Sequence, residues 1–311
     1  MFAGNTSFFA GPAVATGASC AARNGTVDAA RFFGALGIVW FHEHAPFAWL
    51  GYAALPMFMA FVLYFALATS DRPANERRRG TRLLLPWLGW SAIYGVAKIA
   101  DAVANGEPVA AEFAPWMLLA GPKIHLWFLP FAFVAGWGLI ALLPTIRRHC
   151  GFPQLWGLFV AGQVGMFYIV SEIDVAWPMR QWLFVGPACL LGLMLYIAAG
   201  DRNRLLAVLA GSTLACWLAT SFGWPHGAIQ TLIATAVCVA ALAIPLRASA
   251  LTEQMAAISL GIYLVHPLVH SLLMRLPGAA PGTLGFAVSV AAVSVAAAIV
   301  MKQVPGVRRI V

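Results

Sequence analysis

Long, uninterrupted runs of hydrophobic residues follow one another along almost the whole chain. Each run is about 20 residues long, the length of an α-helix that crosses a bilayer, whereas a transmembrane strand would alternate apolar and polar positions. The pattern predicts an all-α fold, a polytopic transmembrane helical bundle of about ten spans. The predicted spans are residues 29–49, 52–70, 83–104, 123–143, 154–171, 182–199, 205–222, 228–246, 254–275 and 283–302.

The connections between these runs are short, so the sequence predicts a single membrane domain. Residues 1–27, rich in Ala, Gly, Ser and Thr, are expected to form a cytoplasmic N-terminal tail. Residues 28–303 are the predicted transmembrane domain, and residues 304–311 a cytoplasmic C-terminal tail. One further apolar piece, residues 113–120, is too short to cross, and we expect it to lie at the interface or to re-enter the membrane.

Composition and charge support a membrane protein. Of the 311 residues, 61% are hydrophobic and 10% are charged, with a mean hydropathy of +0.83. In soluble domains about 45–50% of the residues are hydrophobic and about 25% are charged. In a soluble protein, the net charge of +8 would suggest a nucleic-acid partner. Here we expect no such partner, because the cytoplasmic loops of membrane proteins are rich in Lys and Arg, which accounts for the charge. With the N-terminus inside, 15 of the 19 basic residues are cytoplasmic, all except Lys98, Lys123, Arg180 and Arg275. We therefore expect a multi-pass plasma (bacterial inner) membrane protein with both termini in the cytoplasm.

Polar residues share one face of the first predicted span. On an α-helix, Arg31 and His42 lie within about 20° of each other and about 16 Å apart along the axis, with Asp28 close to the same face. Ionisable groups inside a membrane are costly and by default mark a functional site. The alternative is a snorkelling arginine at the helix end and a histidine whose polar atoms bond a neighbouring helix.

Glu43 follows His42 directly, so on a regular helix it points about 100° away from it. Three roles fit this position: contact with Lys98, contact with another helix, and orientation of an acceptor near the outer surface. Lys98 itself is expected to form a local ion pair with Asp101, three residues later.

A run of arginines precedes the third predicted span. Arg79 and Arg82 are three residues apart and share a helix face. Guanidinium groups grip phosphates bidentately, so the run predicts a phosphate-binding site. The alternative is an anchor that touches anionic lipid.

Two later motifs add histidines and aromatic residues. On a regular helix His125 and Trp127 point in different directions unless the flanking prolines distort the turn, and Trp127 alone would be an interfacial belt residue. In the ninth predicted span, Tyr263 and His266 are neighbours at i and i+3, and His270 follows four residues after His266. No third ligand accompanies these two histidines, so we expect no metal.

Together, in this order, the motifs resemble the acyltransferase 3 family of multi-pass membrane O-acyltransferases. The resemblance rests on Asp28…Arg31…His42, Arg79…Arg82…Pro86, His125-Leu-Trp-Phe and Gly-Ile-Tyr263-Leu-Val-His266-Pro. It implies a donor met from the cytoplasm, acetyl-CoA or another acyl-CoA, and an acceptor hydroxyl on an extracytoplasmic or lipid-linked glycan. It also implies that His42 is essential and that Arg31, Arg79 and Arg82 help to hold the donor.

The chemistry of these residues is compatible with such a reaction. A sugar hydroxyl that attacks a thioester loses its proton in the transition state, and a neutral imidazole accepts a proton at pH 7. His42 is the predicted general base. The residues predicted to bind the acceptor are Glu43, His125, Trp127, Tyr263 and His266, and membrane lipid is a further expected partner.

A multi-pass transporter or flippase-like permease for a glycan or small molecule is the alternative function. Secondary transporters often contain an internal repeat. The second half of this sequence has no equivalent of the Arg31–His42 stripe, which weakens this alternative.

Overall fold

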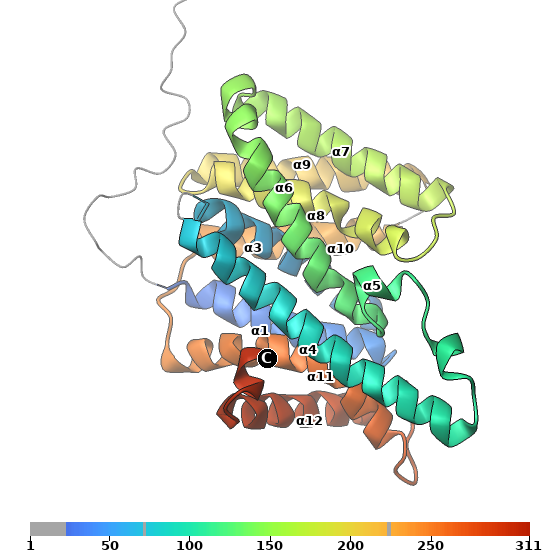
Figure 1. Cartoon of the computed structure of the whole chain (residues 1–311). Coiled ribbons are helices and arrows are strands. Elements are labelled where there is room, and N and C mark those ends of the chain that lie inside the picture. The colour runs from blue at the N-terminus through green and yellow to red at the C-terminus, as the bar shows by residue number, and fades with distance from the viewer. Residues whose placement is uncertain (1–22, 71–72, 223–224) are drawn as a thin grey trace, which may run out of the picture.

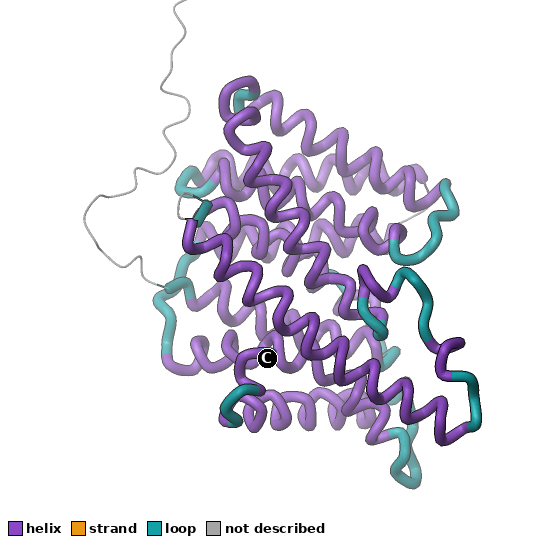
Figure 2. Tube along the Cα trace, viewed as in Figure 1, coloured by secondary structure: helices purple, strands orange, loops and turns teal. Residues whose placement is uncertain are grey.

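The computed structural model describes residues 23–70, 73–222 and 225–311. Of the described residues, 81% are helical (Figure 2). The one β contact among them is an isolated bridge between Asn24 and Arg247. The prediction of an all-α bundle is confirmed. Residues 1–22, most of the predicted N-terminal tail, lie outside the described residues, and so does Arg72 in the first predicted cytoplasmic loop.

The described residues form ten long helices and several short ones. The long helices are α1 (Gly25–His42), α3 (Ala54–Ala68), α4 (Pro73–Asn105), α6 (Phe128–His149), α7 (Phe152–Glu172), α8 (Met179–Ala198), α9 (Arg202–Ala219), α10 (Pro225–Ala243), α11 (Ala250–Leu273) and α12 (Leu284–Gln303). The short ones are α2 (Ala48–Gly51), η2 (Val109–Glu112), α5 (Met117–Ala120), η3 (Ile124–Trp127), η4 (Thr220–Phe222) and η5 (Val307–Arg309).

Eight stretches among the described residues are long and apolar enough to cross a membrane. Helices α1 and α9 are outside this group because charged residues lower their hydropathy, although each has 18 residues. The outward faces are apolar as well: Leu88, Val96 and Val103 of α4 are each more than half exposed. Since lipid covers such a surface at little cost, these helices form a multi-pass membrane bundle.

Helix α1 lies inside the bundle, and Figure 1 shows it between α11 on one side and α3 and α10 on the other. Its side chains Ala35, Ile38 and Val39 are completely or almost completely buried. The short helix α2 approaches α1 at Gly37, where an added Cβ would lie only 3.1 Å from the carbonyl oxygen of Gly51. Glycine at these positions therefore allows the two backbones to touch.

The predicted first span, residues 29–49, is wrong at its end, because α1 stops at His42. His44 and Phe47 have φ angles of 51° and 58°, in the left-handed region that a continuous helix cannot contain. Pro46 lies between them and lacks the N–H that the next helical turn needs. His42 is thus the last residue of α1, and the chain turns back at once into α2 and α3.

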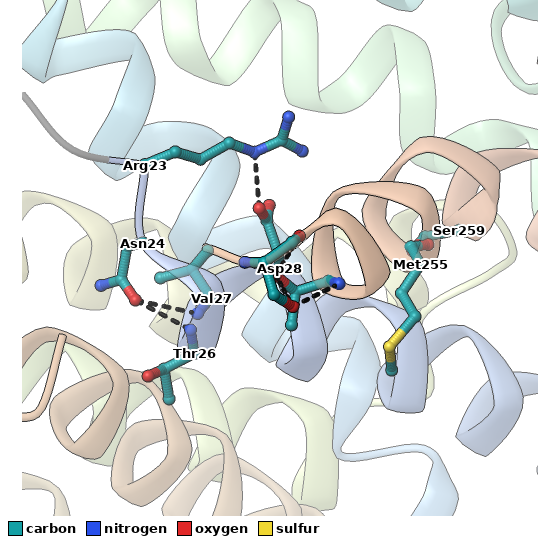
Figure 3. A network of polar contacts seen from close by, with 9 residues as sticks. Arg23, Asn24, Thr26, Val27, Asp28, Met255 and Ser259 are labelled. Atoms are coloured by element: carbon teal, nitrogen blue, oxygen red, sulfur yellow. Dashed lines mark hydrogen bonds and ion pairs between the residues drawn. The ribbon is translucent and has the colours of Figure 1, made fainter. Parts of the chain in front are cut away.

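The N-terminus of α1 is fastened to the connection between α10 and α11. The Gly25 N–H donates to the carbonyl oxygen of Leu246 at 2.8 Å, and the Asn24 side-chain amide donates to that of Ala241 at 2.8 Å. The Asn24 side-chain oxygen also caps α1 by accepting from the Thr26 and Val27 N–H groups (Figure 3). The start of α1 is therefore held by residues more than 200 positions later.

The predicted ion pair between Lys98 and Asp101 is wrong. The Lys98 ammonium lies 2.6 Å from the Glu112 carboxylate, because η2 folds back along the end of α4. Asp101 instead faces Arg275 at 3.9 Å, and both of these side chains are about three-quarters exposed. A pair this exposed adds little stability.

Candidate active site

Three histidines from distant parts of the sequence meet at the C-terminal end of α1. The ring centroids of His42 and His266 are 5.1 Å apart, and those of His125 and His266 are 5.5 Å apart. His125 and His266 are 5% and 1% exposed. Helices α1, η3 and α11 thus each contribute one imidazole to a single cluster.

The position of His125 depends on the 3₁₀ turn η3. Both His125 and Trp127 are buried there, so the flanking sequence does distort the turn that a regular helix would make. The His125 ring packs edge-on against Tyr94 and Tyr263, with centroids 5.3 Å and 5.6 Å away. The Tyr263 hydroxyl donates to the backbone carbonyl of His125, which fixes η3 to α11.

The orientation of His266 follows from Pro267. Proline has no N–H, so Pro267 leaves the carbonyl of Tyr263, four residues before it, without its helical donor. His266 Nδ1 lies 2.7 Å from that carbonyl oxygen. A carbonyl only accepts, so Nδ1 carries the hydrogen and Nε2 of the neutral ring keeps the lone pair. Among the described residues, Nε2 of His266 is buried without a partner, and so is Nε2 of His125.

Glu43 forms a second polar contact beside this cluster. Its carboxylate Oε2 lies 2.9 Å from Nδ1 of His270, which joins the end of α1 to α11. The Glu43 side chain is 1% exposed and His270 is 35% exposed. The other carboxylate oxygen of Glu43 is buried with no partner in the described chain. Of the three roles predicted for Glu43, the structure shows the contact with another helix. Lys98, the other predicted partner, pairs with Glu112 instead.

A cavity of about 340 Å³ opens beside the histidines. Four predicted site residues line it, and Glu43 and His266 are behind its wall. These four are His42, His125, Trp127 and Tyr263. Four polar residues on its wall were not predicted: Arg180, Gln181, His226 and Gln230. Arg180 and Gln181 lie in the first turn of α8, His226 in the first turn of α10 and Gln230 in the next turn. A hydrophobicity pattern contains no signal for polar residues near a helix start.

Of the predicted donor-binding arginines, Arg31 lies toward the other end of α1, about 16 Å from His42 along the axis, and Arg79 and Arg82 belong to the first part of α4. Arg31 interacts electrostatically with Asp28, Arg23 and Arg82. The Asp28 carboxylate is held by Arg23 at 2.5 Å (Figure 3), and this hydrogen bond raises the pKa of Arg23. We call this region, defined by Arg31 and Arg82, the arginine end, and the region of His42 the histidine end.

Arg79 has a partner within the helical bundle. Its Nη1 donates to the carbonyl oxygen of Ala66, in the last turn of α3, at 2.8 Å. This bond satisfies a carbonyl that has no helical donor, at the negative end of the helix dipole. Arg79 therefore ties α4 to α3, and none of Arg31, Arg79 and Arg82 lines the cavity at the histidine end.

The comparison with known families decides the class of protein. The family model described as an acyltransferase domain, acyltransferase 3, matches residues 24–302, nearly the whole chain. The chain belongs to the acyltransferase 3 family. No curated protein and no solved structure matches it. The resemblance inferred from the motifs is confirmed, and the protein is a multi-pass membrane acyltransferase.

The histidines of this acyltransferase 3 protein are arranged around separate hydrogen-bond partners. Within the part of the chain that the structure describes, no group of three His, Cys, Asp or Glu side chains is placed to hold a metal ion. His266 and His270 lie on successive turns of α11, but His270 Nδ1 is turned to Glu43 and His266 Nδ1 to the Tyr263 carbonyl. The two imidazoles thus have separate partners.

Proposed function

We propose that this protein is an acyl-CoA-dependent O-acyltransferase that moves an acyl group, most often acetyl, to a hydroxyl of an extracytoplasmic or lipid-linked glycan. The donor binds at the arginine end from the cytoplasm, and the acceptor enters the cavity at the histidine end. The observation that carries the proposal is the placement of His42 on the wall of a cavity, with His266 and His125 directly behind and beside it.

His42 acts as the general base. The acceptor hydroxyl oxygen attacks the thioester carbonyl carbon while its proton passes to a ring nitrogen of His42. The tetrahedral intermediate then collapses, the carbon–sulfur bond breaks, and the imidazolium returns the proton to the departing thiolate. Acyl ester and free CoA thiol are the products, and no net proton enters or leaves.

His266 is a positioning residue in this proposal. Its Nε2 lone pair is buried, and the 5.1 Å separation of ring centroids puts His42 within reach of it after a small ring rotation. A His42 nitrogen that faces this lone pair carries the hydrogen, and the other nitrogen then presents a lone pair to the cavity. The Tyr263 carbonyl would thus set the tautomer of both rings.

Arg31, Arg79 and Arg82 are the proposed partners of the donor phosphates. Guanidinium groups bind phosphate oxygens with paired, charge-assisted hydrogen bonds. The Asp28 carboxylate is paired with Arg23. Its negative charge is therefore shared between two arginines and does not fully neutralise Arg31. The acyl-bearing pantetheine arm would then run along α1 from the arginine end toward His42.

Glycan mass analysis tests this function most directly. Cells with the gene are expected to carry an acylated glycan that cells without it lack. Complementation with His42→Gln should not restore the modification, whereas the wild-type gene should. Identical glycans in the three strains, or transport of an unmodified glycan without acylation, would contradict the proposal.

A further inference from the structure

The wall of the cavity at the histidine end carries positive and neutral groups but no acid. Among the described residues that line it, none is Asp or Glu, and Arg180 is the one permanent cation. The Arg180 side chain is exposed, and no hydrogen bond or ion pair joins its guanidinium to any described residue. A cation is therefore available at the cavity without an internal counter-charge.

Two helix N-termini add to the positive potential at this cavity. Arg180 and Gln181 belong to the first turn of α8, and His226 and Gly227 to the first turn of α10. The N-terminal end of a helix carries a partial positive charge that favours an anion nearby. Both helices are long, with 20 and 19 residues, so both dipoles are fully developed.

Among the described residues, one on the wall of the cavity has a buried polar atom without a partner. His125 lines the cavity and is 5% exposed, yet its Nε2 has no hydrogen-bond partner within the described chain. Buried polar atoms are nearly always bonded, so a ligand or water is expected to complete this one. Phe41, Tyr52 and Phe184 also line the cavity, and the Tyr52 ring packs against both of the others, with centroids 4.2 Å and 5.0 Å away, so this part of the wall is aromatic and apolar.

We propose that the acceptor is an anionic sugar, whose carboxylate or phosphate binds Arg180 while a ring hydroxyl reaches His42. A neutral sugar offers hydroxyls alone, and a cavity without a carboxylate gives those hydroxyls few acceptors. An anionic sugar instead forms a charge-assisted, bidentate pair with the unpaired guanidinium. Its apolar C–H groups contact the aromatic part of the cavity wall, as ligands commonly do in aromatic pockets. This inference rests on the proposed function for the identity of the site.

Binding of simple glycosides to the detergent-solubilised full-length protein tests the inference without any acyl transfer. Dissociation constants are measured by saturation-transfer NMR titration for methyl β-glucuronide, glucose 1-phosphate and methyl β-glucoside. We expect at least one anionic probe to bind about tenfold or more tightly than the neutral glucoside, since a charged hydrogen bond is gained. The tighter of the two anionic probes identifies the anion as carboxylate or phosphate.

Arg180→Gln should abolish the preference for the anionic probe, and Arg180→Lys should keep part of it because the charge remains without the bidentate geometry. Arg275→Gln is the matched control, since Arg275 is also exposed and faces Asp101 outside the cavity. Higher ionic strength should weaken the anionic probe alone. Equal binding of all three probes, no binding by any, or an unchanged preference in Arg180→Gln would overturn the inference.

The inference and the proposed function fail in different ways. An anionic probe that binds through Arg180 in a protein that acylates no glycan contradicts the function and leaves the anion site intact. Acylation of a cellular glycan, together with no preference among the three probes, contradicts the anion site and leaves the function intact.

Discussion

Pro267 removes one backbone N–H from α11, and this loss orients His266. The freed carbonyl of Tyr263 accepts the hydrogen of His266 Nδ1, so Nε2 of the neutral ring keeps the lone pair, in a ring that packs beside the other two imidazoles. An interior proline usually destabilises a helix. Here the cost is offset by a side-chain hydrogen bond, and the arrangement gives a buried histidine a defined tautomer.

His42→Gln should abolish transfer while the protein remains folded and still binds acyl-CoA. Glutamine keeps a hydrogen-bonding side chain but does not take up the proton, and loss of a general base usually lowers turnover by about 10²–10⁴-fold. Turnover with radiolabelled acetyl-CoA and donor binding are measured on the same preparation. His266→Ala should lower turnover less. Near-normal turnover in His42→Gln with an inactive His266→Ala would exchange the roles of the two histidines.

Glu43→Ala should lower both stability and turnover. The substitution removes a buried hydrogen bond to His270, worth roughly 1–3 kcal/mol. It also removes the contact that holds the C-terminal end of α1, where His42 lies, against α11. The cost is expected below the 3–5 kcal/mol of a fully buried broken pair, because His270 is 35% exposed and can bond water.

Thermal unfolding in detergent measures this effect. Glu43→Gln, which keeps an oxygen acceptor for the His270 N–H, should be closer to wild type than Glu43→Ala. A double-mutant cycle with His270→Ala should give a coupling energy above about 0.5 kcal/mol. Strictly additive losses would show that the 2.9 Å contact contributes nothing to stability.

The residues of the site differ in how far the sequence predicts them. His42, His125, Trp127 and Tyr263 were predicted and line one cavity, because their motifs place polar or aromatic groups within otherwise apolar runs. The partnership of Glu43 with His270 joins positions 227 residues apart, and nothing in local spacing reveals such a pair. A buried acid does require a partner, and that requirement was the available signal.

At the scale of elements, helix interiors were predictable and helix ends were not. The thickness of the bilayer fixes how many apolar residues a spanning helix needs, and the long helices coincide with the apolar runs of that length. The end of α1 depends instead on the conformation of His44 and Phe47, and η3 depends on contacts with α4 and α11. Those ends carry His42 and His125, so two residues of the candidate site lie where the hydrophobic pattern is weakest.

Arg79→Ala and Arg82→Ala should both weaken acyl-CoA binding, by roughly 1–3 kcal/mol each if a charged hydrogen bond to the donor is lost. Arg79→Ala should in addition lower the unfolding temperature, because it removes the bond to the Ala66 carbonyl. Arg82→Ala should leave stability unchanged, since the Arg82 side chain is exposed.

Donor binding and thermal unfolding together separate these roles. Lysine at either position should restore donor binding only in part, because it does not bind phosphate bidentately. Normal donor binding by both alanine variants would assign these arginines to lipid anchoring. A loss of stability in Arg79→Ala without a loss of binding would leave Arg79 a purely structural link between α3 and α4.

At the scale of the whole molecule, the arrangement of basic residues predicts orientation. Single-cysteine variants at positions 72–80 and 304–311 should react with a membrane-impermeant thiol reagent only from the cytoplasmic side, and those at 276–282 only from the other side. The native cysteines are first replaced by serine or alanine. External labelling within 77–79 would invert the topology and remove the argument for a cytoplasmic donor site.

The hydrogen bonds between the start of α1 and the connection from α10 to α11 have a consequence for biogenesis. A ribosome makes α1 first and α11 nearly last, so α1 is inserted long before its partners exist. Until α11 arrives, Arg31 and His42 face lipid, water or the insertion machinery rather than their final neighbours. A chain released before residue 250 would contain His42 without His266, so the histidine cluster is complete only after α11 has been made.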